Sequence, residues 1–170
     1  MTKLNAVITD WSTMSMVGDV SYSSIEKLCD SLTVYDLTPY DENIIVERIG
    51  NAEVLLCNKT PITRNVMERC KNLKYIGLFA TGFNNIDVDY ARKRGIGVSN
   101  VAGYSTNAVV QHTFAMALGL LNEVIYHDNY VKSGEYSKSG LFTCLNRPYY
   151  EIQNKVWGII GLGVIGRRVA

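Results

Sequence analysis

Short apolar runs alternate with helical patterns through the first hundred residues of this 170-residue chain. Each run is rich in Val, Ile, Leu, Phe or Tyr and is too short for a helix, as expected of strands buried on both faces. The five runs are Leu4–Thr9, Leu32–Leu37, Ala52–Cys57, Leu73–Phe79 and Ile96–Ser99. Parallel strands need a crossover connection, and a helix is the usual one. The alternation therefore predicts an α/β domain over residues 1–100, a parallel sheet with helices on its faces.

Residues that favour helix ends lie between these runs. A side-chain oxygen at the first position can accept a hydrogen bond from the first turn, and glycine suits the residue after the last turn. We expect four helices: one capped by Ser23 or Ser24 and running through Cys29, Glu42–Ile49 capped by Asp41 and ended by Gly50, Arg64–Cys70 capped by Thr63, and Val88–Arg94 capped by Asp87 and ended by Gly95.

The alternation stops after Asn100. Apolar residues recur at helical spacing over Ser105–Val131, which predicts one long helix, capped by Ser105 or Thr106, that connects two lobes. A polar and aromatic segment follows, and a new strand is expected at Val156–Ile160. We therefore divide the chain into residues 1–103, 104–154 and 155–170. One strand and the start of a helix cannot make a domain, so we expect this chain to be the front portion of a longer protein.

Composition excludes several classes of protein. Lys and Arg total 17 and Asp and Glu total 16, so the net charge of +1 provides no field for nucleic acid or an anionic membrane. The four cysteines, Cys29, Cys57, Cys70 and Cys144, form no CxxC pair, which favours a reduced compartment and no metal site. No apolar stretch suits a signal peptide or a membrane span. We expect a soluble cytoplasmic protein.

A glycine motif carries the sharpest chemical signal. Gly161, Gly163 and Gly166 follow the predicted strand directly and open a helix, the context of a dinucleotide-binding turn. The first glycine makes the tight turn, the second lets the backbone approach a pyrophosphate, and the third lets helix and strand pack closely. The alternative is an ordinary turn that needs small residues, and the context favours the cofactor. The confirming acidic or Arg position would lie about 20 residues further on.

A second cluster, Phe79–Asp87, follows the fourth predicted strand. Ligands of open α/β folds gather at the carboxyl edge of the sheet, and Thr81 and Gly82 place two backbone N–H groups in a turn of small residues there. Such a turn suits a carboxylate. A plain connection, with Asp87 capping the next helix, explains the same residues equally well, and both readings stay open at this point.

The two histidines are weaker candidates. His112 has no Asp or Glu within a helical turn to orient it, so packing between lobes is favoured over catalysis. His127 lies beside Asp128 and is expected to be solvated. Tyr149, Tyr150 and the other tyrosines are expected to pack, because no basic run interleaves with them to make a nucleic-acid platform.

Taken together, these segments resemble the D-isomer-specific 2-hydroxyacid dehydrogenases, in particular their glycerate dehydrogenase/hydroxypyruvate reductase branch. The matching stretches are Asn58–Thr60, Ala80–Asp87, Gly97–Val101, Tyr104–His112 and the strand and glycine turn from Lys155. The resemblance implies a flavodoxin-like or Rossmann-like substrate lobe over residues 1–103, an interdomain helix and arm over 104–154, and the first βα unit of an NAD(P)-binding Rossmann domain from 155.

The resemblance also implies ligands and roles. In this family a small 2-oxo or 2-hydroxy acid binds between two lobes and exchanges a hydride with NAD or NADP. NAD is favoured here, although the position that decides between the two lies beyond the motif. Arg167 and Arg168 do not argue for NADP, because they lie on the first turn of the helix and not at the ribose position. Thr81 and Gly82 would bind the substrate carboxylate, with Tyr104 near the substrate. The cofactor would meet Gly161, Gly163, Val164, Ile165 and Gly166. Relatives form homodimers through the second lobe and the arm.

One departure limits the activity expected of this chain. The catalytic Arg, Glu and His of the family lie beyond the glycine motif, so no catalytic residue is assigned, and neither His112 nor His127 matches. Gln111 stands where many relatives carry Glu. We expect the full-length protein to reduce hydroxypyruvate or glyoxylate and the 170-residue chain to be inactive. The alternative is an NAD(H)-sensing corepressor of the same fold. An exposed apolar peptide groove on residues 1–100, with no carboxylate site at Thr81 and Gly82, would favour it.

Overall fold

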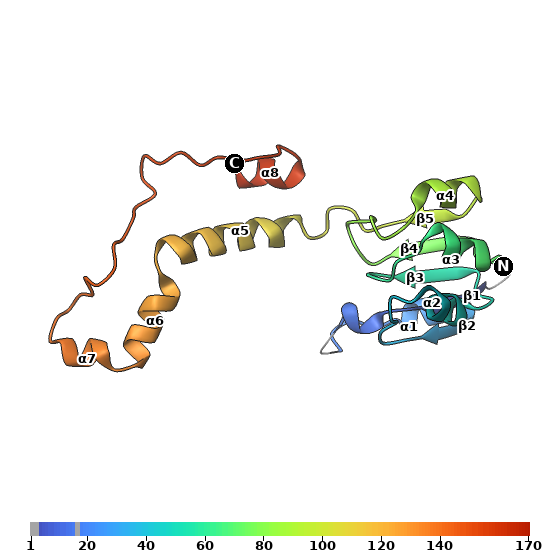
Figure 1. Cartoon of the computed structure of the whole chain (residues 1–170), viewed down its shortest axis with the longest axis horizontal. Coiled ribbons are helices and arrows are strands. Elements are labelled where there is room, and N and C mark those ends of the chain that lie inside the picture. The colour runs from blue at the N-terminus through green and yellow to red at the C-terminus, as the bar shows by residue number, and fades with distance from the viewer. Residues whose placement is uncertain (1–3, 16–17) are drawn as a thin grey trace. The chain divides into compact units, whose positions relative to one another are not determined.

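A computed structural model describes residues 4–15 and 18–170, and the chain divides into two compact units. Unit 1 is Met1–Ala102 and unit 2 is Gly103–Ala170. Figure 1 shows a sheet with its helices in unit 1 and helices joined by irregular segments in unit 2.

Unit 1 is built on a five-stranded sheet in which every pair of neighbouring strands is parallel. The strands are β1 (Leu4–Ile8), β2 (Cys29–Val34), β3 (Val54–Cys57), β4 (Tyr75–Leu78) and β5 (Gly97–Ser99), in the order β2-β1-β3-β4-β5 (Figure 1). This is the flavodoxin-like order, whose direction reverses between β1 and β3. The α/β fold class predicted from the sequence is confirmed.

The helices of unit 1 are α1 (Ser23–Glu26), α2 (Glu42–Ile49), α3 (Arg64–Arg69) and α4 (Val88–Lys93), with a 3-10 turn, η1 (Trp11–Thr13). The predicted caps Asp41, Thr63 and Asp87 are confirmed, because each side chain accepts a hydrogen bond from a backbone N–H of its first turn. The first helix was predicted wrongly. Tyr22 precedes it and no side chain caps it, and it ends before Cys29, which already pairs with Leu4 at the start of β2.

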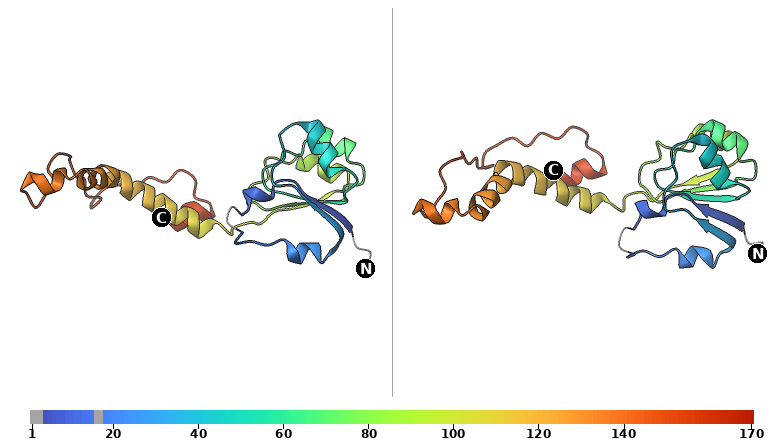
Figure 2. Two further views of the ribbon diagram at one scale, coloured as in Figure 1. Left: turned by 90° about the horizontal axis from the view of Figure 1, so that it is seen from below. Right: turned by 60° about the horizontal axis from the view of Figure 1, so that its bottom comes forward.

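The core of unit 1 lies between the sheet and helices α2 to α4. Val7, Leu55 and Ile76 of the strands are buried against Ile45 of α2 and Val66 of α3. Figure 2 shows α1 on the opposite face of the sheet from α2 and α3. Burial of one such aliphatic side chain stabilises the fold by about 1.5–3 kcal/mol, so this layer supplies most of the stability of unit 1.

Unit 2 contains α5 (Thr106–Leu121), α6 (Val124–Lys132), α7 (Glu135–Ser139) and α8 (Val164–Val169). The single long helix predicted over Ser105–Val131 is wrong. Glu123 has a left-handed backbone (φ 49°), and the helix bends there by 60° between α5 and α6. Ser105 precedes α5 without a side-chain cap. The ring of Phe114 in α5 stacks on Trp157, with 5.6 Å between centroids.

The strand predicted at Val156–Ile160 is not formed, so the predicted first βα unit consists of a turn and a helix. Val156 and Ile160 are fully exposed. A parallel strand is held by hydrogen bonds to a neighbouring strand, and none of residues 103–170 forms one. A helix, in contrast, makes its hydrogen bonds within its own segment, which is why α8 forms where the strand does not.

No single helix in the described part of the chain is long and apolar enough to cross a membrane. The helices α5 and α6 reach that length and composition together, but the 60° bend separates them.

Candidate functional site

The loop after β4 begins the candidate site. Phe79 donates its backbone N–H to Cys57 at the end of β3, and at the other end of the loop Asp87 caps α4. Ile62 and Ile86 form an isolated parallel bridge. The loop Phe79–Asp87 is therefore fixed at both ends. It lies at the carboxyl edge of the sheet, as the sequence predicted.

Thr81 and Gly82 lie at the exposed top of this loop. Within the described residues, their backbone N–H groups donate no hydrogen bond. The carbonyl oxygens behind them are engaged, since Val101 donates its N–H to Ala80 (3.0 Å) and the Asn100 amide donates to Thr81 (2.7 Å). The turn thus presents two free backbone donors on exposed residues, which is the arrangement that an anionic ligand needs.

A buried carboxylate organises the adjacent edge, where the strand order reverses. Asp10 follows β1 and is 2% exposed. It accepts hydrogen bonds from the backbone N–H groups of Asn58 (2.8 Å), Lys59 (2.7 Å) and Thr60 (2.8 Å), and from the Thr60 hydroxyl (2.9 Å). Successive N–H groups of this kind form an anion-binding nest, and here Asp10 fills the nest itself.

The Asp10 nest is connected to the candidate loop through Asn85. The Asn85 amide donates to the carbonyl oxygens of Asn58 (3.4 Å) and Thr60 (2.9 Å). The segment Asn58–Thr60 is thus held by Asp10 on one side and by Asn85 on the other. Sequence reasoning missed Asp10, Asn85 and Asn100 as organising residues. The available signal was their position after apolar runs, the same signal that singled out Thr81 and Gly82.

Two buried thiols of unit 1 are unreactive because of their surroundings. Burial, and secondarily the charge of Asp10, raises the pKa of Cys57 to about 12. Burial raises the pKa of Cys70 to about 11. Neither thiol is a nucleophile at neutral pH, because the reactive form is the thiolate. Among the described residues, no group of three or more His, Cys, Asp or Glu side chains could hold a metal ion.

In unit 2, Tyr104 is 66% exposed just before α5. His112 is exposed on α5 within this unit, and the packing between lobes predicted for it stays a prediction. His127, predicted to be solvated, is half-buried, and its ring meets the edge of Tyr126 at 5.3 Å between centroids.

The glycine motif forms a turn that requires glycine at two positions. Gly161 has φ +94°, a conformation that other residues rarely adopt, and a Cβ on Gly166 would lie 2.1 Å from the Gly161 carbonyl oxygen. A Cβ on Gly163 would meet nothing within 4 Å, so the backbone there faces open space. The first backbone N–H groups of α8, including those of Val164 and Ile165, have no partner within the helix. This turn fits a dinucleotide pyrophosphate.

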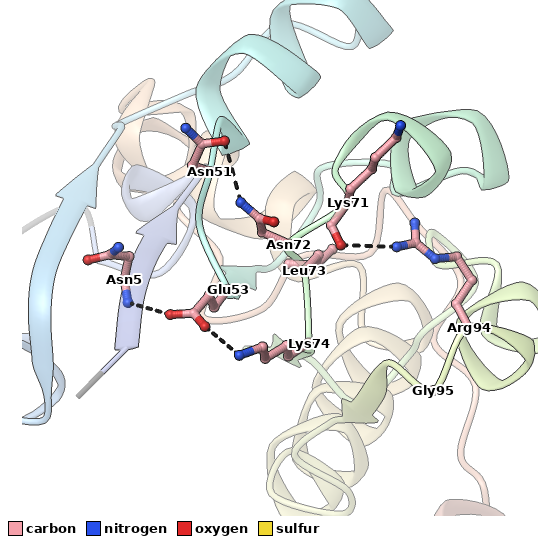
Figure 3. Close-up of a pocket in the computed structure, with 9 residues that line it drawn as sticks. All are labelled: Asn5, Asn51, Glu53, Lys71, Asn72, Leu73, Lys74, Arg94 and Gly95. Atoms are coloured by element: carbon pink, nitrogen blue, oxygen red, sulfur yellow. Dashed lines mark hydrogen bonds and ion pairs between the residues drawn. The ribbon is translucent and has the colours of Figure 1, made fainter. Parts of the chain in front are cut away.

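A hollow of about 690 Å³ lies at the opposite, amino edge of the sheet (Figure 3). Its polar groups are engaged with one another. Glu53 bonds Lys74 (2.6 Å) and the Asn5 N–H (3.4 Å), and Arg94 donates to the Lys71 carbonyl (3.2 Å). Ligands of open parallel sheets bind at the carboxyl edge, so the Thr81–Gly82 turn remains the better candidate.

Comparison with known proteins decides the family. The sequence model of "D-isomer specific 2-hydroxyacid dehydrogenase, catalytic domain" matches residues 12–154. The chain belongs to the D-isomer specific 2-hydroxyacid dehydrogenase family. The resemblance inferred from the sequence is therefore confirmed.

Individual relatives of this chain agree with the family assignment. It is 36% identical to a hydroxypyruvate reductase of Blautia hydrogenotrophica over 151 residues, which cover 88% of this chain and 47% of the relative. It is 33% identical to a glycerate dehydrogenase of Methylorubrum extorquens, over 74% of this chain and 40% of the relative. The structure of D-lactate dehydrogenase from Aquifex aeolicus, complexed with NAD and lactic acid, matches with a TM-score of 0.75 and 28% identity, over 97% of this chain and 46% of that one. The chain thus spans a little under half the length of these relatives.

Proposed function

We propose that this chain works, as part of a longer protein, in the reduction of a small 2-oxo acid by a nicotinamide cofactor. Hydroxypyruvate and glyoxylate are the substrates we favour, because relatives that cover most of this chain are named for them. The residues group into a substrate lobe (1–103), a connecting helix and arm (104–154) and the beginning of a cofactor domain (155–170).

The observation that carries this proposal is the pair of free N–H groups on Thr81 and Gly82. A 2-oxo acid presents a carboxylate next to the reacting carbonyl, so holding the carboxylate on two fixed donors also orients the carbonyl carbon. Backbone donors suit this role because they carry no charge to neutralise and cannot change rotamer. Tyr104 is assigned to the neighbourhood of the substrate by the family resemblance.

The cofactor is assigned to the turn of Gly161, Gly163 and Gly166, with the N–H groups of Val164 and Ile165 as donors to the pyrophosphate. A nicotinamide bound in this way would supply the hydride. We favour NAD over NADP, because the solved relative at 28% identity is complexed with NAD. Further parts of the proposal are a homodimeric full-length protein and a cytoplasmic location.

We also propose that the 170-residue chain alone does not turn over, because the Arg, Glu and His that polarise the carbonyl and move the proton in this family match no position here. The measurement is NADH oxidation with hydroxypyruvate or glyoxylate, followed by absorbance, for the chain and for the protein of full family length. Turnover by the full-length protein alone is expected. Turnover by the 170-residue chain at an ordinary enzymatic rate would overturn the assignment of roles.

The carboxylate site has a matched pair of variants at one position. Gly82→Pro removes the N–H donor. Gly82→Ala keeps it, and its Cβ would meet nothing within 4 Å. In the full-length protein we expect Gly82→Pro to raise KM for the 2-oxo acid about tenfold or more relative to Gly82→Ala, the cost of one hydrogen bond to a charged group. Equal KM values for the two variants would exclude Gly82 as a carboxylate donor.

A further inference from the structure

Two peptide groups of the candidate loop, Ala80–Thr81 and Thr81–Gly82, are held in place by the segment that follows β5. In each, the carbonyl oxygen accepts a hydrogen bond from that segment. The backbone N–H of Val101 donates to the Ala80 carbonyl (3.0 Å), and the side-chain amide of Asn100 donates to the Thr81 carbonyl (2.7 Å). Each of these carbonyls shares a peptide plane with the next N–H group. The Ala80 carbonyl is paired in this way with the Thr81 N–H, and the Thr81 carbonyl with the Gly82 N–H.

Peptide geometry then sets the direction of both donors. Residues 4–15 and 18–170 contain no cis peptide bond, so C=O and N–H point in opposite directions across each plane. With both carbonyls directed at Asn100 and Val101, the N–H groups of Thr81 and Gly82 point away from that segment. They are left free on the exposed side of the loop.

We propose that Asn100 is the positioning residue for carboxylate recognition, acting through the Thr81–Gly82 peptide; this rests on the proposed function, in which these two N–H groups bind the substrate carboxylate. The bond to Ala80 is made by backbone, so every residue except proline at position 101 can make it. The bond to Thr81 needs a side-chain donor of suitable length, and Asn100 provides it.

The loss of this bond would do more than remove one contact. Thr81 and Gly82 are exposed, and a Cβ on Gly82 would meet nothing within 4 Å, so packing does not resist rotation of the peptide. A rotated Thr81–Gly82 peptide would turn its carbonyl oxygen toward the ligand, and an acceptor would then face a carboxylate. Asn100 therefore selects the orientation in which the peptide donates.

Asn100 is itself well anchored. It directly follows β5, where Ser99 pairs with Gly77 of β4 and its hydroxyl is hydrogen-bonded to the Tyr75 hydroxyl. The far end of the loop is held independently, because the Ile62 backbone N–H donates to the Asn85 carbonyl oxygen (2.8 Å). Replacing Asn100 should consequently free one peptide plane and leave the rest of the loop in place.

The 170-residue chain allows a direct test by NMR. The chain is labelled with ¹⁵N and titrated with sodium glyoxylate at constant ionic strength, with sodium chloride as the reference salt. We expect the amide signals of Thr81 and Gly82 to shift in a saturable way. Asn100→Ala should weaken this binding about tenfold, the effect of losing one oriented donor to a charged group. Asn100→Asp should weaken it further, because a carboxylate cannot donate to the Thr81 carbonyl and repels the ligand. Asn100→Gln, which keeps an amide donor, should restore part of the binding.

Asn72→Ala is the matched control, since it removes the same side chain, also hydrogen-bonded, from the opposite edge of unit 1. It should bind glyoxylate like the wild type. No shift at Thr81 and Gly82 in the wild type would reject the proposed carboxylate site itself. Wild-type binding that Asn100→Ala and Asn100→Asp leave unchanged would reject only the role of Asn100. If binding falls together with changes in core amide signals in every Asn100 variant, the role is structural and the inference is wrong.

Discussion

The two units of this chain differ in how far their side chains are buried. Unit 1 has a continuous core in which residues such as Ile45, Leu55 and Ile76 are completely buried. In unit 2, no residue from 103 to 170 is buried, although four helices form there. Both units carry a motif assigned to ligand binding, the Thr81–Gly82 turn in unit 1 and the glycine turn in unit 2.

This difference shows that one turn takes its shape from neighbouring residues in the sequence, whereas the other takes its shape from contacts that the folded sheet provides. The glycine turn of unit 2 depends on a left-handed Gly161 and on the close approach of Gly166, which are properties of six consecutive residues. The Thr81–Gly82 turn depends on Asn100, Val101 and the segment at Asn58–Thr60, which the sheet brings together. The glycine turn therefore shows that a motif can be recognised in the sequence although no long-range contact fixes its shape.

The largest contrast we expect between the units is in thiol reactivity. The pKa of Cys57 is raised to about 12 and that of Cys70 to about 11, whereas Cys144 in unit 2 is half-buried. At pH 8 the thiolate fraction of Cys57 falls about 1000-fold below that of an ordinary thiol. Labelling with a disulfide reagent, followed by peptide mapping, should modify Cys144 quickly and Cys57 only after unfolding in urea.

The pH dependence of this effect has a defined sign. A raised pKa in the folded state means that the unfolded chain releases the proton first. The stability due to the neutral Cys57 thiol is therefore complete below the unfolded pKa and is lost as pH rises from about 9 toward 12. A Cys57→Ala variant should show a shallower loss of stability over that range. Rapid labelling of Cys57 in the folded chain would contradict its burial.

The second comparison concerns the free energy of unfolding after an isoleucine is replaced in each unit. Ile76→Ala should lower the free energy of unfolding by about 3 kcal/mol, because Ile76 is completely buried in β4 and the lost methyl groups leave a cavity. The same change at Ile160, which is fully exposed, should alter stability by less than about 0.5 kcal/mol. Urea unfolding followed by circular dichroism measures both. A similar loss for both variants would mean that Ile160 is covered in solution.

The sequence predicted unit 1 well because its signals are local and agree with its core. The five apolar runs became the five strands, and Asp41, Thr63 and Asp87 cap the expected helices. The failures have identifiable causes. The run at Val156–Ile160 has the composition of a strand but no neighbour to pair with. The break at Glu123 follows from a left-handed residue that periodicity does not reveal.

The candidate site was only partly visible in the sequence. The Thr81–Gly82 turn could be singled out because small residues follow an apolar run. Asp10, Asn85 and Asn100 organise that edge through contacts between residues 19 to 50 positions apart. Which of the many Asp and Asn residues make such contacts depends on strand order, and strand order is a property of the folded sheet.

The Asp10 nest allows a third comparison. Asp10→Ala should cost about 2–3 kcal/mol of unfolding free energy, because three backbone N–H groups and the Thr60 hydroxyl lose their acceptor in a buried place. Asp128 of unit 2 is paired with Lys132 at 2.7 Å on an exposed helix face, so Asp128→Ala should lie within experimental error. The measurement is again urea unfolding. A loss at Asp10 no larger than that at Asp128 would show that water replaces the carboxylate without cost.

The smallest effect we expect concerns helix caps, where the two units differ in one specific contact. The Asp87 carboxylate accepts a hydrogen bond from the Tyr90 N–H (2.9 Å) at the start of α4, whereas Ser105 makes no such bond at the start of α5. Asp87→Ala should therefore cost about 1 kcal/mol, and Ser105→Ala should cost almost nothing, although both replace a residue that is favoured at this position. Amide hydrogen exchange of the first turn of each helix measures the effect locally. Faster exchange in α4 alone is expected. Equal acceleration in α5 would mean that Ser105 caps its helix in solution, and the sequence signal for a cap would then have been correct in both units.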